Sequence, residues 1–316
     1  VASADVVAGT GVGTGSLSLT DATSLQVSQG GIGHSLIVPY FNAQNGNMTV
    51  LHVVNTDTAN GKAVKVRFRG AANSDDVMDF QVFMSPGDVW TAAVTAGADG
   101  IAQVQTADNT CTVPSLGFNT PQAFTTSRLN PNHTDEAKAS GTREGYVEIF
   151  NMADIPGTTG SLYTAIKHVT GVAPCTATVI EPIMLKKDHT EETAVKAGFN
   201  TPTTGLMGDW YIINVGQSTT FAGAATALTA VTTTGGTTAG RGNFVHFPQT
   251  STAAPSIESN SSDPLFRVNF TRDNTNAAVT TAAIRAANYD LPDLSTPYTR
   301  NAGGTAAVDT RVPAYT

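Results

Sequence analysis

The sequence predicts a mainly β protein: an antiparallel β-sandwich, Ig-like or jelly-roll-like, with a few short helices and long loops. Two observations predict this class. Short apolar runs alternate with polar residues, which is typical of half-buried strands. About seven such runs, separated by compact turn signals, occur in the first 115 residues, and this spacing is that of a sandwich.

Residues 48–94 form the centre of the predicted sandwich. Turn signals at 57–61 and 85–88 divide this stretch into runs that we expect to form an antiparallel meander. Its middle run alternates between apolar and basic residues, and successive strand side chains point to opposite faces of a sheet. The expected core residues are therefore Val64, Val66 and Phe68, and the basic residues expected to face water are Lys65, Arg67 and Arg69.

Further strands are expected on both sides of this centre. Residues 34–40 begin the packed region, and residues 79–84 and 101–105 show the same alternation. Trp90 follows the second turn in an apolar run and is expected in the core.

Residues 114–200 are predicted to be a loop-rich insertion. Periodicity is lost at first, and Pro, Asn, Thr and Ser accumulate there. Periodic spacing of apolar residues then returns in short segments, and two of these segments end at a glycine, as helices often do. The strands expected here are 145–150 and 175–183, and the helices are 161–169, with Ser161 as its cap, and 190–197.

The remaining residues extend the same domain, which we expect to cover 34–316. Residues 209–215 are strongly apolar and are expected to be buried on both faces, with Trp210 in the core. Residues 216–262 show no clear pattern. A strand is expected at 265–271 and an Ala-rich helix at 277–288.

Residues 1–33 are predicted to be a separate N-terminal arm. They are rich in Gly, Ser, Thr and Val, but no Gly-Lys-Ser/Thr follows the glycines, so a phosphate loop is not indicated. We expect either a flexible arm or an extended strand that pairs with a neighbour's sheet edge. The apolar residues expected to serve assembly are Val6, Val7, Leu17 and Leu19.

The composition is poor in charge. Only 13% of the residues are charged, and small uncharged residues replace them. Such a surface favours packing against copies of the same chain, although an extracellular β protein with a Thr/Asn-rich exterior would look alike. The net charge of −8 argues against nucleic acid as a partner, because binding a phosphate backbone needs a basic surface.

Two cysteines, Cys111 and Cys175, are expected to form a disulfide in an oxidising compartment, with two buried free thiols as the alternative. Calcium is the one cofactor that the sequence suggests. Its candidate ligands are Asp75, Asp76 and Asp79, since hard cations bind clustered carboxylates; solvated turns are the alternative interpretation.

No catalytic constellation is found, and we expect a protein that is not an enzyme. The sequence has no Gly-x-Ser-x-Gly motif, and its six histidines share no spacing. No apolar run reaches the roughly 20 residues of a membrane-spanning helix. The first residues, Val1 to Ala4, are typical of a chain whose signal peptide has been removed, although a fragment would begin in the same way.

Several segments resemble a group of secreted cell-surface proteins of proteobacteria, whose short β-proteobacterial members are similar to surface-array (S-layer) proteins. The likeness covers roughly residues 36–230 and is carried by residues 63–70, 73–80, 84–92, 142–150, 175, 209–215 and 225–228. It implies a protein at the surface of a Gram-negative bacterium that assembles with copies of itself over the outer membrane. It brings no catalytic residues.

We therefore expect a structural protein that forms an extracellular lattice, with outer-membrane components as further partners. A subunit of a filament or sheath is one alternative, because both need adhesive faces and contacts that do not close into a ring. A secreted monomeric module that binds carbohydrate or a surface is another. An exposed aromatic platform would favour that module.

Overall fold

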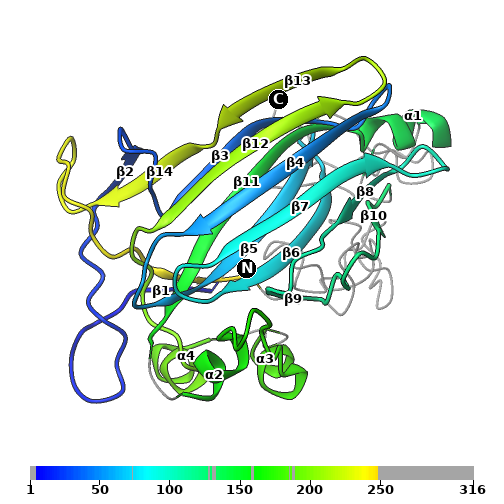
Figure 1. Ribbon diagram of the computed structural model, residues 1–316. Helices are drawn as coiled ribbons and strands as arrows, with labels where there is room; N and C mark the ends of the chain where they lie inside the picture. Colours follow the sequence, from blue (N-terminus) through cyan, green and yellow to red (C-terminus); the bar gives the residue numbers. More distant parts are fainter. Residues whose placement is uncertain are drawn as a thin grey trace, which may run out of the picture.

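The computed structural model describes residues 5–247, apart from residues 73, 127–128, 130–132, 158–159, 185 and 187–188. The expected strand at 265–271 and helix at 277–288 lie outside the described residues. Within the described part, two antiparallel sheets face each other and confirm the predicted β-sandwich with short helices (Figure 1).

Both large sheets combine strands from distant parts of the chain. In order across the sheet, the six-stranded sheet contains β10 (Gln122–Ala123), β8 (Ala102–Gln105), β7 (Val89–Ala96), β4 (Asn47–Asn55), β12 (Leu206–Asn214) and β13 (Thr219–Ala224). The seven-stranded sheet contains, again in spatial order, β2 (Ser24–Val27), β14 (Thr226–Val231), β3 (Ser35–Asn42), β11 (Glu144–Ile155), β5 (Gly61–Gly70), β6 (Asp76–Met84) and β9 (Cys111–Val113). A separate two-stranded sheet pairs β1 (Asp5–Val7) with β15 (Phe244–His246).

The strands expected at 48–94 are present, but they do not form the expected antiparallel meander. β4 pairs with β7 in one sheet, whereas β5 pairs with β6 in the other. Both predicted turns therefore cross between the sheets and lie beside each other. The N–H of Asn55 donates to Asp88 O at 2.8 Å, and the N–H of Gly87 donates to Asp57 O at 3.0 Å. Local turn chemistry identifies the turns but not the sheets that they connect.

Four short helices accompany the sheets: α1 (Asp135–Gly141), α2 (Ser161–Ile166), α3 (Ala177–Met184) and α4 (Glu191–Ala197). The helix expected at 190–197 is found as α4, where the Thr190 side chain caps the start and Gly198, at φ 95°, ends it. Gly160, rather than Ser161, is the N-cap of α2.

The strand expected at 175–183 is wrong, because α3 occupies most of it. Ile180 and Met184 lie four residues apart on one side of this helix, and both are buried in the core beneath it. A short apolar run does not distinguish a buried strand from a buried helix. Packing against the sheet decides the outcome in this segment.

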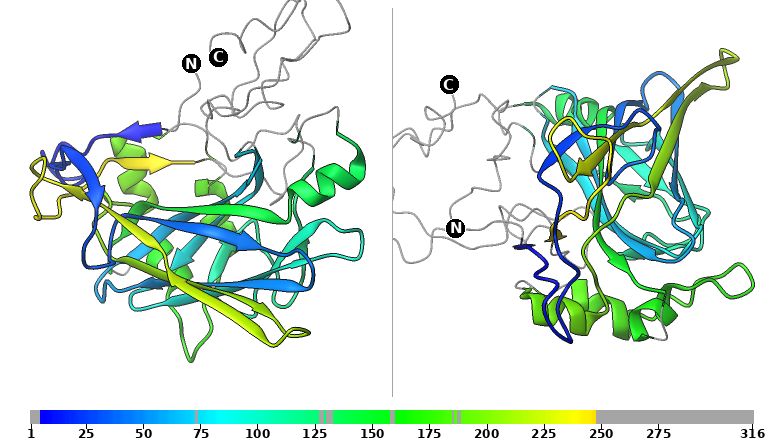
Figure 2. Two further views of the ribbon diagram at one scale, coloured as in Figure 1. Left: turned by 90° about the horizontal axis from the view of Figure 1, so that it is seen from above. Right: turned by 90° about the vertical axis from the view of Figure 1, so that its left-hand side faces the viewer.

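Two cores hold the molecule together. The larger core lies between the two sheets and includes an aromatic group in which the Phe80 and Trp90 ring centroids are 5.6 Å apart. The second lies on the outer face of the seven-stranded sheet, where α2, α3, α4 and β15 cover it (Figures 1 and 2). The disulfide between Cys111 and Cys175 is present and ties β9 to the segment before α3.

Candidate assembly surface

The predicted calcium ligands lie on or beside β6, next to the basic side chains of β5. Asp75, Asp76 and Asp79 are all buried, with 2%, 1% and 1% of their surface exposed. Lys65 Nζ donates to Asp79 Oδ1 at 2.7 Å, and Arg67 Nη2 lies 3.4 Å from Asp76 Oδ2. These carboxylates therefore do not form a solvated turn, which is the alternative interpretation of the sequence.

These ion pairs disfavour calcium binding at β6. The nearby protein cations offset the negative charge that would attract the ion. Within the described ranges, no group of three or more His, Cys, Asp or Glu side chains is arranged to hold a metal. The arrangement is a buried ion-pair row on the outer face of the sheet.

The prediction that Lys65, Arg67 and Arg69 face water is wrong. Their exposed fractions are 0%, 6% and 5%. The reason is a further layer on the outer face of the seven-stranded sheet: the Arg67 guanidinium lies 5.8 Å from the centre of the Phe247 ring, and Gln81 Nε2 donates to Phe247 O. Burial lowers the pKa of Lys65 to about 8, against the opposing attraction of Asp79.

Four of the five predicted core residues are fully buried. Val64, Val66, Phe68 and Trp90 each show 0% exposure and belong to the core between the sheets. Trp210 is half-buried at the rim of that core, and β12 buries one face only, so the expected burial on both faces is wrong.

The described part of the N-terminal segment, residues 5–33, packs on its own chain. β1 pairs with β15, and β2 pairs with β14. Among the predicted assembly residues, Leu17 is fully buried in the second core and Val7 packs against that core. Val6 and Leu19 are exposed, at 56% and 58%.

Glu191, the first residue of α4, holds the loop of the N-terminal segment. Its Oε1 accepts hydrogen bonds from the N–H groups of Thr10, at 2.8 Å, and Leu17, at 3.0 Å. The hydrogen bond from the Thr10 N–H also lowers the pKa of Glu191. No local pattern in the sequence indicates this contact, because its partners are more than 170 residues apart.

Two edge strands lie on the same side of the sandwich. β2 ends the seven-stranded sheet and β13 ends the six-stranded sheet; among the described residues, each has a strand partner on one side only. β13 and β14 are separated by Ala225 alone, and β14 pairs with β2. This continuity brings both edges to one side of the molecule.

β13 is unusually exposed for a strand. Five of its six residues are exposed and the sixth is half-buried, because the β12–β13 hairpin projects beyond the sandwich (Figure 2, right). Phe221 is 65% exposed and Val215, at the turn, is 79% exposed. On β2, Leu25 and Val27 are exposed at 58% and 55%.

Neither edge carries the features that usually block strand pairing. The sequences Ser-Leu-Gln-Val of β2 and Thr-Thr-Phe-Ala-Gly-Ala of β13 contain no charge and no proline. Charged or Pro-containing edges are the usual defence against edge-to-edge association. We define the assembly surface as these two strands with the Val215 turn.

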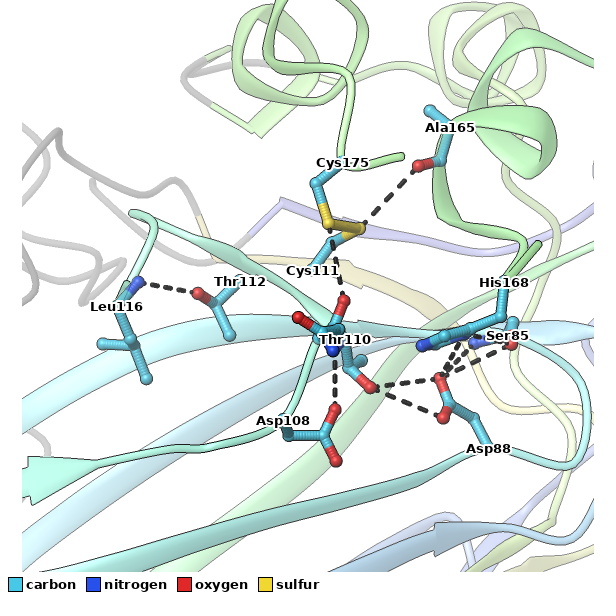
Figure 3. The surroundings of a disulfide bond; sticks show 11 residues. Ser85, Asp88, Asp108, Thr110, Cys111, Thr112, Leu116, Ala165, His168 and Cys175 are labelled. Carbon is cyan, nitrogen blue, oxygen red and sulfur yellow. Dashed lines mark hydrogen bonds and ion pairs between the residues drawn. A yellow bond between two sulfur atoms is a disulfide. The ribbon is translucent and has the colours of Figure 1, made fainter. Parts of the chain in front are cut away.

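A serine, a histidine and an aspartate meet at the second inter-sheet turn (Figure 3). Ser85 Oγ lies 3.0 Å from His168 Nδ1, and Asp88 Oδ2 lies 3.5 Å from the same nitrogen. In a nucleophilic triad the serine and the acid contact different ring nitrogens. Ser85 is also buried. The cluster links the turn to the end of α2 and does not have triad geometry.

Comparison of the chain with protein-family models, with curated proteins and with solved structures finds no match. In the part of the chain that the structure describes, no helix has the length and apolar character needed to cross a membrane.

Proposed function

We propose that the protein is a structural cell-surface protein that assembles with copies of itself into an extracellular lattice. The observation that carries this proposal is the assembly surface: two uncharged, proline-free edge strands with exposed Leu25, Val27 and Phe221 on one side of the sandwich.

The physical basis is strand addition between copies. An edge strand presents unpaired N–H and C=O groups, and a second strand can satisfy them while the exposed apolar side chains leave water. β2 and β13 differ in sequence, so pairing of β13 in one copy with β2 in the next is a heterologous contact. Contacts of this type propagate when they do not close into a ring.

Two further features support assembly outside the cell. Few charges are available to keep copies apart, since only 13% of the residues are charged. The Cys111–Cys175 disulfide is typical of an oxidising environment such as the surface of a Gram-negative bacterium. Outer-membrane components are the further partners that this location suggests.

Electron microscopy of the purified protein, with added calcium and with chelator, tests the proposal. A regular sheet supports the lattice, and a fibre supports the filament alternative. Because the carboxylates of Asp76 and Asp79 pair with basic side chains, we expect the same assembly in chelator. Dispersed single particles in every condition would contradict assembly altogether.

A further inference from the structure

A cleft lies beside the disulfide, at the opposite end of the seven-stranded sheet from β2. Its volume is about 350 Å³, within the range of about 300–1,000 Å³ that is usual for small-molecule sites. One wall is β9 with the loops around it, and the other is the segment that contains Cys175 and the start of α3. The disulfide joins the two walls (Figure 3).

Several polar groups of the cleft have no partner within the described part of the chain. Asp108 Oδ1 accepts from the N–H of Thr110 at 2.7 Å, which leaves Oδ2 available. The side chains of Asn109, Ser115 and Glu181 line the cleft and make no hydrogen bond to any described residue. All three residues are exposed, so their polar atoms can reach a ligand.

Phe118 gives the same cleft an exposed aromatic ring. The residue is 56% exposed, yet its backbone is held beside Thr106: the two residues form a β-bridge, and the Asn119 N–H donates to Thr106 O at 2.7 Å. An exposed ring on a fixed backbone can stack on a ligand at low cost in conformational entropy.

The chemistry of the lining argues against two ligand classes, anions and metal ions. Two carboxylates, from Asp108 and Glu181, repel anions, and none of the described lining residues is basic. No metal-binding group of three or more acidic, His or Cys side chains occurs among the described residues, in this cleft or elsewhere. A neutral ligand with many hydroxyl groups and one apolar face can donate hydrogen bonds to the free acceptors and stack its apolar face on the Phe118 ring.

We propose that this cleft binds a neutral carbohydrate chain. A pyranose ring would stack the C–H groups of one face on Phe118 and donate hydroxyl hydrogen bonds to Asp108 Oδ2 and Glu181. Asn109 and Ser115 can donate to the remaining hydroxyl oxygens. This site lies away from the assembly surface, so it does not depend on the proposed function.

An array of neutral oligosaccharides tests the site: hexasaccharides of glucose, mannose, galactose and N-acetylglucosamine, with an oligoglucuronate as the anionic comparison. The wild-type protein should bind at least one neutral member saturably. Phe118→Ala and Glu181→Gln should each weaken that binding at least tenfold. Both residues are exposed, so the midpoint of thermal unfolding should stay the same.

Val12→Ala is the control, because it removes an exposed apolar side chain that lies outside both the cleft and the assembly surface. Its binding should equal that of the wild type. The proposal is overturned if no neutral oligosaccharide binds, if only the oligoglucuronate binds, or if Phe118→Ala binds as tightly as the control.

Discussion

Lys62 shows at the residue scale how this protein accommodates buried charge. Its side chain is fully buried, and Nζ contacts Asp154 Oδ1 at 2.7 Å, Thr203 Oγ1 at 2.9 Å, Asp57 Oδ2 at 3.2 Å and Thr204 O at 3.3 Å. Removing one partner of such a pair leaves the other charge buried without compensation.

Lys62→Met is therefore expected to lower the free energy of unfolding by about 3 kcal/mol. The matched control is Lys196→Met, which breaks an exposed pair with Glu192 and should leave the free energy of unfolding close to that of the wild type, because water already screens the pair. Urea unfolding of both variants checks the prediction. Equal effects of the two substitutions would contradict the role assigned to Lys62.

Asp57 makes stability depend on acid pH. Burial opposes its charge, but hydrogen bonds from Asn60 and Ala59 and the charge of Lys62 together hold the pKa of Asp57 at about 2, below the ordinary value of 3.8. The folded state thus binds fewer protons than the unfolded state between these values. Its contribution is present above about pH 4 and is lost as the pH falls to about 2.

We expect Asp57 to account for about 1 to 2 kcal/mol of the stability lost over that interval, since the carboxylate is partly exposed. Asp57→Asn should flatten the curve of unfolding free energy against pH between about 4 and about 2. Parallel curves for the variant and the wild type would refute this assignment.

The errors on the outer face of β5 have one physical cause. Val64, Val66 and Phe68 are predictable because strand alternation defines the inner face. Whether Lys65 and Arg67 on the outer face meet water depends on Phe247, a residue far away in the sequence, and on the layer of helices. Local periodicity carries no such information.

At the scale of elements, α4 and the N-terminal segment form one unit. The helix starts at a capping box on Thr190. Its first residue is Glu191, whose Oε1 accepts hydrogen bonds from the N–H groups of Thr10 and Leu17. Leu17 fills the core beside it. This carboxylate and this apolar side chain fix the loop between β1 and β2, while the two strands themselves are held by their pairing with β15 and β14.

Glu191→Ala should free this loop without unfolding the sandwich. The amide hydrogens of Thr10 and Leu17 lose their acceptor, so their exchange should accelerate at least tenfold in hydrogen-exchange measurements. Amides of β5 and β11 serve as the internal control and should exchange as in the wild type. Unchanged protection at Thr10 and Leu17 would contradict the contact.

Local signals place the ends of α4 correctly, although they misplace the N-cap of α2. The cap Thr190 and the stop Gly198 are local signals, and α4 lies where they indicate. α3 takes the place of an expected strand, because the burial of Ile180 and Met184 against the sheet is a tertiary effect.

At the scale of the whole molecule, the sandwich class, most of the core and the disulfide are predictable from alternation, turn signals and cysteine count. The assembly surface is only partly predictable. Leu25 and Val27 belong to the N-terminal segment that the sequence assigns to assembly, whereas β13 lies in a stretch without clear pattern. Which strands end a sheet depends on strand order, a long-range property.

The most direct measurement is the critical concentration for assembly, followed by light scattering, for the wild type, Phe221→Lys and the control Phe118→Lys. A charge on β13 should block strand pairing and raise this concentration at least tenfold, whereas the control should match the wild type. Equal critical concentrations for all three proteins, or a wild type that stays monomeric at every concentration, would contradict assembly through the edge strands.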